Sequence, residues 1–189
     1  MKLLALCGSL RTGSHNRQLL DHATKLLEKA GVEIEPVDFR RLAIPIYDGD
    51  VEASTGLPPG ALELARQIAG SDGLVIASPE YNMSMPALLK NVIDWMSRAK
   101  PMPLRGKWAL LLSASPSLVG GNRGLWALRV PLEVLGVHVY PDMFSLATAH
   151  QAFNPDGSVK DEALERFLTR IVDNFVRVST AVAASAKKS

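Results

Sequence analysis

The chain has 189 residues, enough for one domain with a substantial core and too few for two comfortable ones. Hydrophobic residues make up 47% and charged residues 21%, which argues against disorder, and the formal net charge of +2 is scattered, which argues against a nucleic-acid-binding surface. The single cysteine, Cys7, excludes an internal disulfide and a cysteine metal cluster, and we expect it to be a buried core residue. No signal peptide or membrane-spanning run is evident, so we expect a cytoplasmic protein that binds neither membrane nor metal.

Five apolar stretches predict β-strands. Continuously apolar runs predict strands buried on both faces, at residues 2–7, 73–77 and 108–113. Alternating patterns, the first of them interrupted by a proline, predict edge strands at residues 32–39 and 137–140.

Amphipathic segments between these strands predict helices. They cover residues 14–30, 61–69, 86–96 and 125–135, and a last helix carries apolar positions from 164 to 175. Residues 40–60 have no sustained period and predict an irregular loop. The tail from Ala183 is expected to fray.

Strands alternating with helices predict a single α/β domain over residues 1–189, a three-layer, doubly wound parallel sheet. With the alternating strands at its borders, the strand order is 2-1-3-4-5, which is the flavodoxin-like arrangement. A ligand crevice is then expected at the carboxyl ends of strands one, three and four. Three unusual loops lie there, at residues 9–16, 79–82 and 113–121.

The first loop has the composition of an anion-binding site. It contains two glycines, three hydroxyls, an amide and two arginines, with no acidic residue before Asp21, and it opens a helix whose first N–H groups are free to bind an anion. Ser14 and His15 stand where a Walker A motif needs Lys and Ser or Thr, and Leu10 stands where a dinucleotide fingerprint needs Gly. A single terminal phosphate is the remaining candidate; an ordinary strand-to-helix turn is the alternative.

The second and third loops are mostly uncharged and suit a flat heterocycle. Metal-ligand spacings, a nucleophile elbow and a carboxylate pair are all missing, so a cofactor is expected to carry any chemistry, with no catalytic side chain.

Four spaced motifs together resemble the NADPH-dependent FMN reductase family, which includes flavodoxin-like quinone, chromate and azo reductases. They are Gly8-Ser9-Leu10-Arg11 with Ser14 and Asn16, then Pro79-Glu80-Tyr81-Asn82, Lys90-Asn91-x-x-Asp94-Trp95 and Gly120-Gly121-x-Arg123. The likeness covers nearly the whole chain, including the segment from Leu42 to Asp48. Departures at Met83, Leu88 and Ser117 leave the range of acceptors open.

The resemblance implies bound FMN, with NADPH or NADH as co-substrate, and homodimers or homotetramers. The first loop would hold the phosphate, the second would lie along the isoalloxazine ring, and the third would close its other side. The implied cofactor-binding residues are Ser9, Leu10, Arg11, Ser14, His15, Asn16, Pro79, Glu80, Tyr81, Asn82, Ala114 and Ser115.

The predicted function is therefore ping-pong hydride transfer from NAD(P)H through FMN to a small-molecule acceptor such as a quinone, chromate, an azo compound or free flavin. One alternative is a flavodoxin-like electron carrier without direct NAD(P)H oxidation, although such carriers are typically acidic and this chain is mildly basic. Another is a flavin-free module that binds a different phosphate ligand.

Overall fold

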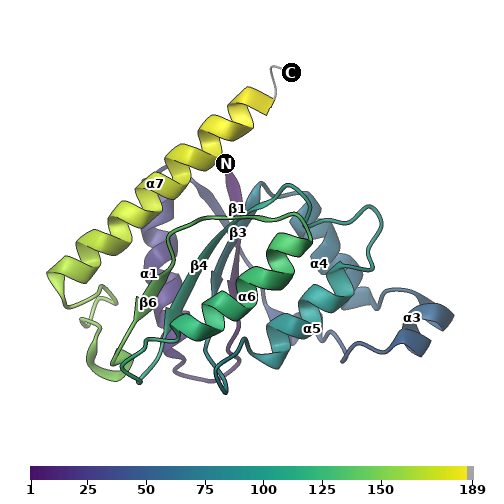
Figure 1. Ribbon diagram of the computed structural model, residues 1–189, viewed down its shortest axis with the longest axis horizontal. Helices are drawn as coiled ribbons and strands as arrows, with labels where there is room; N and C mark the ends of the chain where they lie inside the picture. The colour runs from purple at the N-terminus through teal and green to yellow at the C-terminus, as the bar shows by residue number, and fades with distance from the viewer. Residues whose placement is uncertain (187–189) are drawn as a thin grey trace.

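A parallel six-stranded β-sheet forms the centre of the computed structural model, which describes residues 1–186 (Figure 1). The strands follow the order β2-β1-β3-β4-β5, and β6 also pairs with β4. Their bounds are β1 Lys2–Cys7, β2 Glu33–Pro36, β3 Gly73–Ala77, β4 Trp108–Ala114, β5 His138–Val139 and β6 Phe144–Leu146. The predicted order is confirmed.

Helices cover both faces of this sheet. On one face lie α1 (His15–Lys29) and α7 (Glu162–Ala186), and on the other lie α4 (Pro59–Ala69), α5 (Ala87–Met96) and α6 (Asn122–Val134). Alternate residues of β1 serve the two layers: Leu3 and Ala5 pack toward α1 and α7, whereas Leu4 and Leu6 pack toward the other helices. Both faces of the central strands are thus buried, as their continuous apolar runs predicted.

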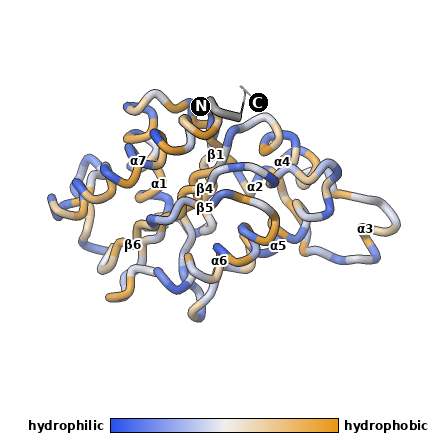
Figure 2. The backbone as a smooth tube through the Cα atoms, turned by 45° about the horizontal axis from the view of Figure 1, so that its top comes forward, coloured by the Kyte–Doolittle hydropathy of each residue, from blue (hydrophilic) through white to orange (hydrophobic). Residues whose placement is uncertain are grey.

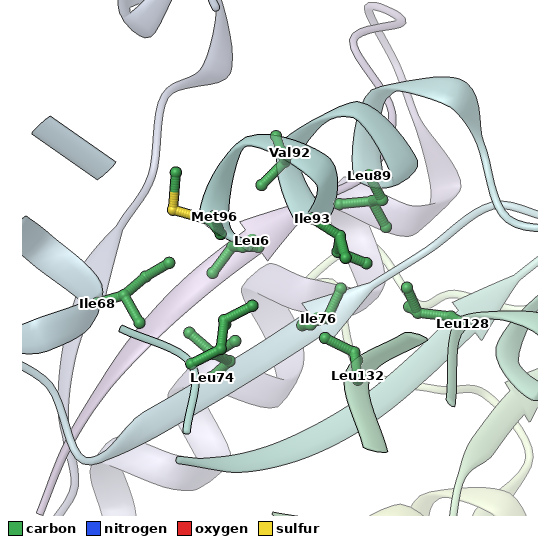
Figure 3. Close-up of a pocket in the computed structure, with 11 residues that line it drawn as sticks. Leu6, Ile68, Leu74, Ile76, Leu89, Val92, Ile93, Met96, Leu128 and Leu132 are labelled. Atoms are coloured by element: carbon green, nitrogen blue, oxygen red, sulfur yellow. The ribbon is translucent and has the colours of Figure 1, made fainter. Parts of the chain in front are cut away.

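The core beneath α5 is packed almost without gaps. Side chains of β1, β3, α4, α5 and α6 line a cavity of about 20 Å³. Figure 3 shows these side chains pointing toward one another. Apolar side chains alone line it, so it offers no group that would hold water or a polar ligand. Cys7 is buried in the opposite core layer and is a free thiol, as predicted.

The last edge of the sheet differs from the prediction. The strand expected over 137–140 is only His138–Val139, and a second piece, β6, resumes the pairing with β4 further along. His138 and Tyr140 donate their N–H groups to Lys107 O and Ala109 O, both at 2.8 Å, and the pairing with β4 is interrupted beyond Tyr140. The edge strand is therefore split in two.

Residues 40–60 were predicted as an irregular loop, which is wrong in part. Two short helices, α2 (Phe39–Leu42) and α3 (Gly49–Thr55), occur there, and α3 projects from the body of the protein with no buried residue (Figures 1 and 2). The carboxylates of Asp38 and Asp48 accept hydrogen bonds from the first N–H groups of these helices. Helices of four and seven residues are too short to show a hydrophobic period.

The C-terminal helix continues further than expected. α7 extends through Ala186, past the point at Ala183 where fraying was predicted, and the rest of the predicted tail, residues 187–189, lies outside the described residues. Within residues 1–186, no helix combines the length and apolar character needed to cross a bilayer. A short 3₁₀ helix, η1 (Ala149–Gln151), lies in the segment between β6 and α7.

Candidate functional site

A cleft of about 220 Å³ opens at the carboxyl ends of β1, β3 and β4. Ten of the twelve predicted cofactor-binding residues line it, joined by Pro116, which the sequence did not single out. The ten are Ser9, Arg11, Ser14, His15, Asn16, Pro79, Glu80, Tyr81, Ala114 and Ser115. The cleft is smaller than a typical ligand pocket, so a ligand the size of FMN must extend out of its mouth.

The start of α1 provides free hydrogen-bond donors at one end of this cleft. Ser14 is the N-cap, and its hydroxyl accepts from Arg17 N at 3.3 Å. The backbone N–H groups of Ser14, His15 and Asn16 make no hydrogen bond with any residue from 1 to 186. Three free N–H groups at the positive end of a 15-residue helix suit a phosphate.

Cationic and neutral side chains surround these N–H groups. The Arg11 guanidinium is exposed and donates from Nη2 to Gly13 O at 3.1 Å, which folds it back over the loop. Burial, the Arg11 charge and the neighbouring His150 together lower the pKa of His15 below its ordinary value of 6.5. His15 is therefore neutral at pH 7, and an anion bound beside it would raise its pKa.

Asn16 cross-links two of the three loops. Its Nδ2 donates to Ala114 O at 2.8 Å, and Ala114 N–H donates to its Oδ1 at 3.0 Å. Both residues are buried. The side chain thus fixes the start of α1 against the end of β4, and its backbone N–H remains available to a phosphate.

The second loop is anchored through Glu80. The Glu80 carboxylate accepts from Arg123 Nε at 2.8 Å and from the Gly124 N–H at 3.2 Å, and its side chain is only 8% exposed. Burial by itself would raise the pKa of this carboxyl, but the two hydrogen bonds and the Arg123 charge outweigh it and leave the pKa below 4.5. An ionised Glu80 therefore holds the loop against the first turn of α6.

The remaining two predicted residues, Leu10 and Asn82, do not line the cleft. Leu10 is exposed, and its carbonyl accepts from Arg40 Nη2 at 2.6 Å. Asn82 lies at the tip of a tight turn that two hydrogen bonds close between Tyr81 and Ser84.

The motif Lys90-Asn91-x-x-Asp94-Trp95 acts on the protein itself. Asn91 Nδ2 and Trp95 Nε1 both donate to Pro45 O, at 2.8 and 2.9 Å, and Asn91 Oδ1 accepts from Tyr47 N at 2.7 Å. Lys90 pairs with Asp94 one turn along α5. The motif therefore clamps the segment before α3 onto α5.

The third loop depends on two glycines. Gly120 and Gly121 both have positive φ, and a Cβ at Gly121 would overlap the Ser113 hydroxyl. Their absence of side chains lets the loop after β4 return closely over the strand end.

A larger cleft, of about 620 Å³, lies at the opposite, amino-terminal edge of the sheet. Lys107, which is half-buried in this cleft, donates hydrogen bonds to the carbonyls of Ala69 and Ser71 and so caps the C-terminal end of α4. This cation has a structural role, and none of the predicted site residues lines that cleft.

Comparison with known proteins agrees with this geometry. The model of the NADPH-dependent FMN reductase family matches residues 1–151. The chain is 40% identical to an NAD(P)H-dependent FMN reductase of Pseudomonas aeruginosa over 164 residues, covering 86% of each chain, and 37% identical to a quinone reductase of Escherichia coli K12 over 172 residues, covering 89% of this chain and 90% of the relative.

The flavoenzyme NAD(P)H:(acceptor) oxidoreductase FerB of Paracoccus denitrificans has a similar structure. Its TM-score is 0.81 at 30% sequence identity, over 95% of this chain and 97% of that one. The predicted resemblance is confirmed, and with it the flavodoxin-like fold and the family's dependence on FMN and NAD(P)H. This chain belongs to the NADPH-dependent FMN reductase family.

Proposed function

We propose that this protein is an FMN-dependent NAD(P)H oxidoreductase that reduces small quinones, with free flavin, azo compounds and chromate as further candidate acceptors. The observation that carries the proposal is the cleft itself, which combines free helix N–H groups at one end with loop surface at the other, where the carboxylate of Glu80 is paired with Arg123. The similarity to an FMN reductase of P. aeruginosa, a quinone reductase of E. coli and a flavoenzyme oxidoreductase of P. denitrificans supports the proposal.

In this proposal the phosphate of FMN binds at the start of α1. Ser9, Arg11, Ser14 and His15 surround it, and the Asn16 N–H donates to it. The donors there are neutral or cationic, which suits a group carrying roughly two negative charges.

The isoalloxazine ring then lies between the second and third loops, with Pro79, Glu80 and Tyr81 on one side and Ala114 and Ser115 on the other. Leu10 and Asn82 lie outside the cleft, and their proposed contacts are with the part of FMN that extends from its mouth. Bound FMN supplies hydride acceptance from the nicotinamide and hydride donation to the acceptor. The protein binds and orients both, and a quinone that receives a hydride takes its one remaining proton from solvent, so no side chain acts as a catalytic acid.

The test is the visible spectrum of the purified protein before and after anaerobic addition of NADPH or NADH, with the released flavin identified. We expect FMN, bleaching by the nicotinamide and recovery of the yellow colour on addition of a quinone. A protein that holds FMN but is not reduced directly by either nicotinamide would support the electron-carrier alternative. A protein that does not bind added FMN would overturn the proposal.

We further propose a homodimer or homotetramer in the cytoplasm. The outer face of α6 carries an exposed apolar stripe at Trp126, Val130 and Val134, spaced four residues apart. A second copy of the chain is the proposed partner for that stripe. Light scattering of the wild type and of Val130→Glu tests this, because a charge on the stripe should reduce the mass of the assembly.

A further inference from the structure

Met83 has a backbone conformation that its side chain disfavours. Its φ is +64° and that of Asn82 is +51°, and Tyr81 and Ser84 exchange two backbone hydrogen bonds of 3.0 Å around them. Two central residues with positive φ define a type I′ turn, whose second central position is ordinarily glycine. Asparagine tolerates this region, whereas a long side chain such as that of methionine is strained there.

The surrounding structure keeps this turn from relaxing. Glu80, directly before it, is held by Arg123 and by the Gly124 N–H. A Cβ at Gly124 would lie 3.0 Å from Glu80 Cα and 3.1 Å from Ser84 O, so the start of α6 packs against both ends of the turn. Strain of this kind persists where neighbours over-determine the conformation, and it is frequent at functional sites.

The Met83 side chain is not part of the hydrophobic core. It is 66% exposed, and Tyr81, which lines the cleft, is 51% exposed. In the neighbouring loop after β4, Leu118 is 86% exposed and Val119 is also exposed. Four large apolar or aromatic side chains are therefore exposed on the two loops that flank the proposed ring site.

We propose that Met83 is a specificity-determining residue whose thioether side chain contacts the rings of apolar acceptors such as naphthoquinones at the mouth of the cleft. This inference rests on the proposed function. A flexible, polarizable side chain adapts to flat rings of different shape and contributes little to a hydrophilic acceptor. The strained turn presents that side chain to solvent.

The test compares Met83→Gly with Ala43→Gly in the FMN-loaded protein. Ala43 also has positive φ, +46°, but it caps α2 and does not line the cleft. Both variants should raise the thermal midpoint by about 2–4 °C, because glycine relieves the left-handed strain. With NADPH saturating, we expect Met83→Gly to lower kcat/KM for menadione about tenfold, chiefly through KM, and to leave kcat/KM for ferricyanide within twofold.

Ala43→Gly should change neither acceptor, and Met83→Leu should retain most of the menadione activity. If the ratio of kcat/KM for menadione to kcat/KM for ferricyanide is unchanged in Met83→Gly, including by an equal loss with both acceptors, the inference is overturned. A changed oligomeric mass of Met83→Gly would also overturn it. Failure of the wild type to bind FMN or to oxidise NADPH with either acceptor would instead overturn the proposed function.

Discussion

Replacing Asn16 by alanine removes the two hydrogen bonds that join the start of α1 to the end of β4. Both are short, 2.8 and 3.0 Å, and both involve the backbone of buried Ala114. Each bond contributes about 0.5–1.5 kcal/mol, and leaving its buried backbone partner unpaired costs about 1–3 kcal/mol. We therefore expect the free energy of unfolding of the flavin-free protein to fall by about 2–4 kcal/mol.

Urea denaturation of the flavin-free protein, followed by circular dichroism, measures this loss. Asn174→Ala is the matched control, because the same substitution at this half-buried position of α7 removes only an exposed contact with Arg177 and should cost less than about 0.5 kcal/mol. FMN affinity should also fall, since two loops of the cleft lose their connection. A flavin-free Asn16→Ala protein as stable as the wild type, with weakened FMN binding alone, would refute this reasoning and make Asn16 a simple phosphate ligand.

Four further substitutions test the electrostatics and the backbone of the site. Arg123→Leu should cost about 1–2 kcal/mol at pH 7, because it leaves the Glu80 carboxylate with little compensation although Arg123 itself is partly exposed. Since the folded pKa of Glu80 lies below 4.5, the stability that its ionised carboxylate contributes is present above pH 4.5 and is lost on acidification through the folded pKa. The difference in unfolding free energy between pH 7 and pH 4 should therefore be smaller in this variant than in the wild type. His15 has a folded pKa below 6.5, so the flavin-free wild type should lose stability as the pH falls below 6.5. In His15→Gln the thermal midpoint should depend less on pH between pH 7 and pH 5, and parallel curves for the two proteins would contradict this. Gly121 has φ +87°, and a Cβ there overlaps the buried Ser113 hydroxyl, so Gly121→Ala should lower the free energy of unfolding by about 2–4 kcal/mol. Gly13 has φ +68° with open space around it, so Gly13→Ala should cost only about 1 kcal/mol. Equal losses of the two variants in thermal melts would argue against the overlap.

Apolar patterning alone predicts the central strands, the strand order and the edge of the sheet at which the three loops meet. Continuous and alternating apolar runs are local patterns, and they distinguish central from edge strands without any knowledge of the fold. The strand order then places the three unusual loops at one edge. The pattern that predicts phosphate binding at residues 9–16 is also local, since it depends on glycines, hydroxyls and a helix start within one short segment.

The partners of these polar side chains within the protein depend instead on tertiary packing. Asn16 reads as a phosphate donor in the sequence, but its amide is bonded to Ala114, which lies 98 residues away. Glu80 is predicted as part of a ring-binding loop, and its carboxylate is neutralised by Arg123 at the start of α6. Likewise, the strain at Met83 arises because the start of α6 fixes its turn. Such partners depend on the distances between whole elements, whereas hydrophobic periodicity reports only which face of one element is buried.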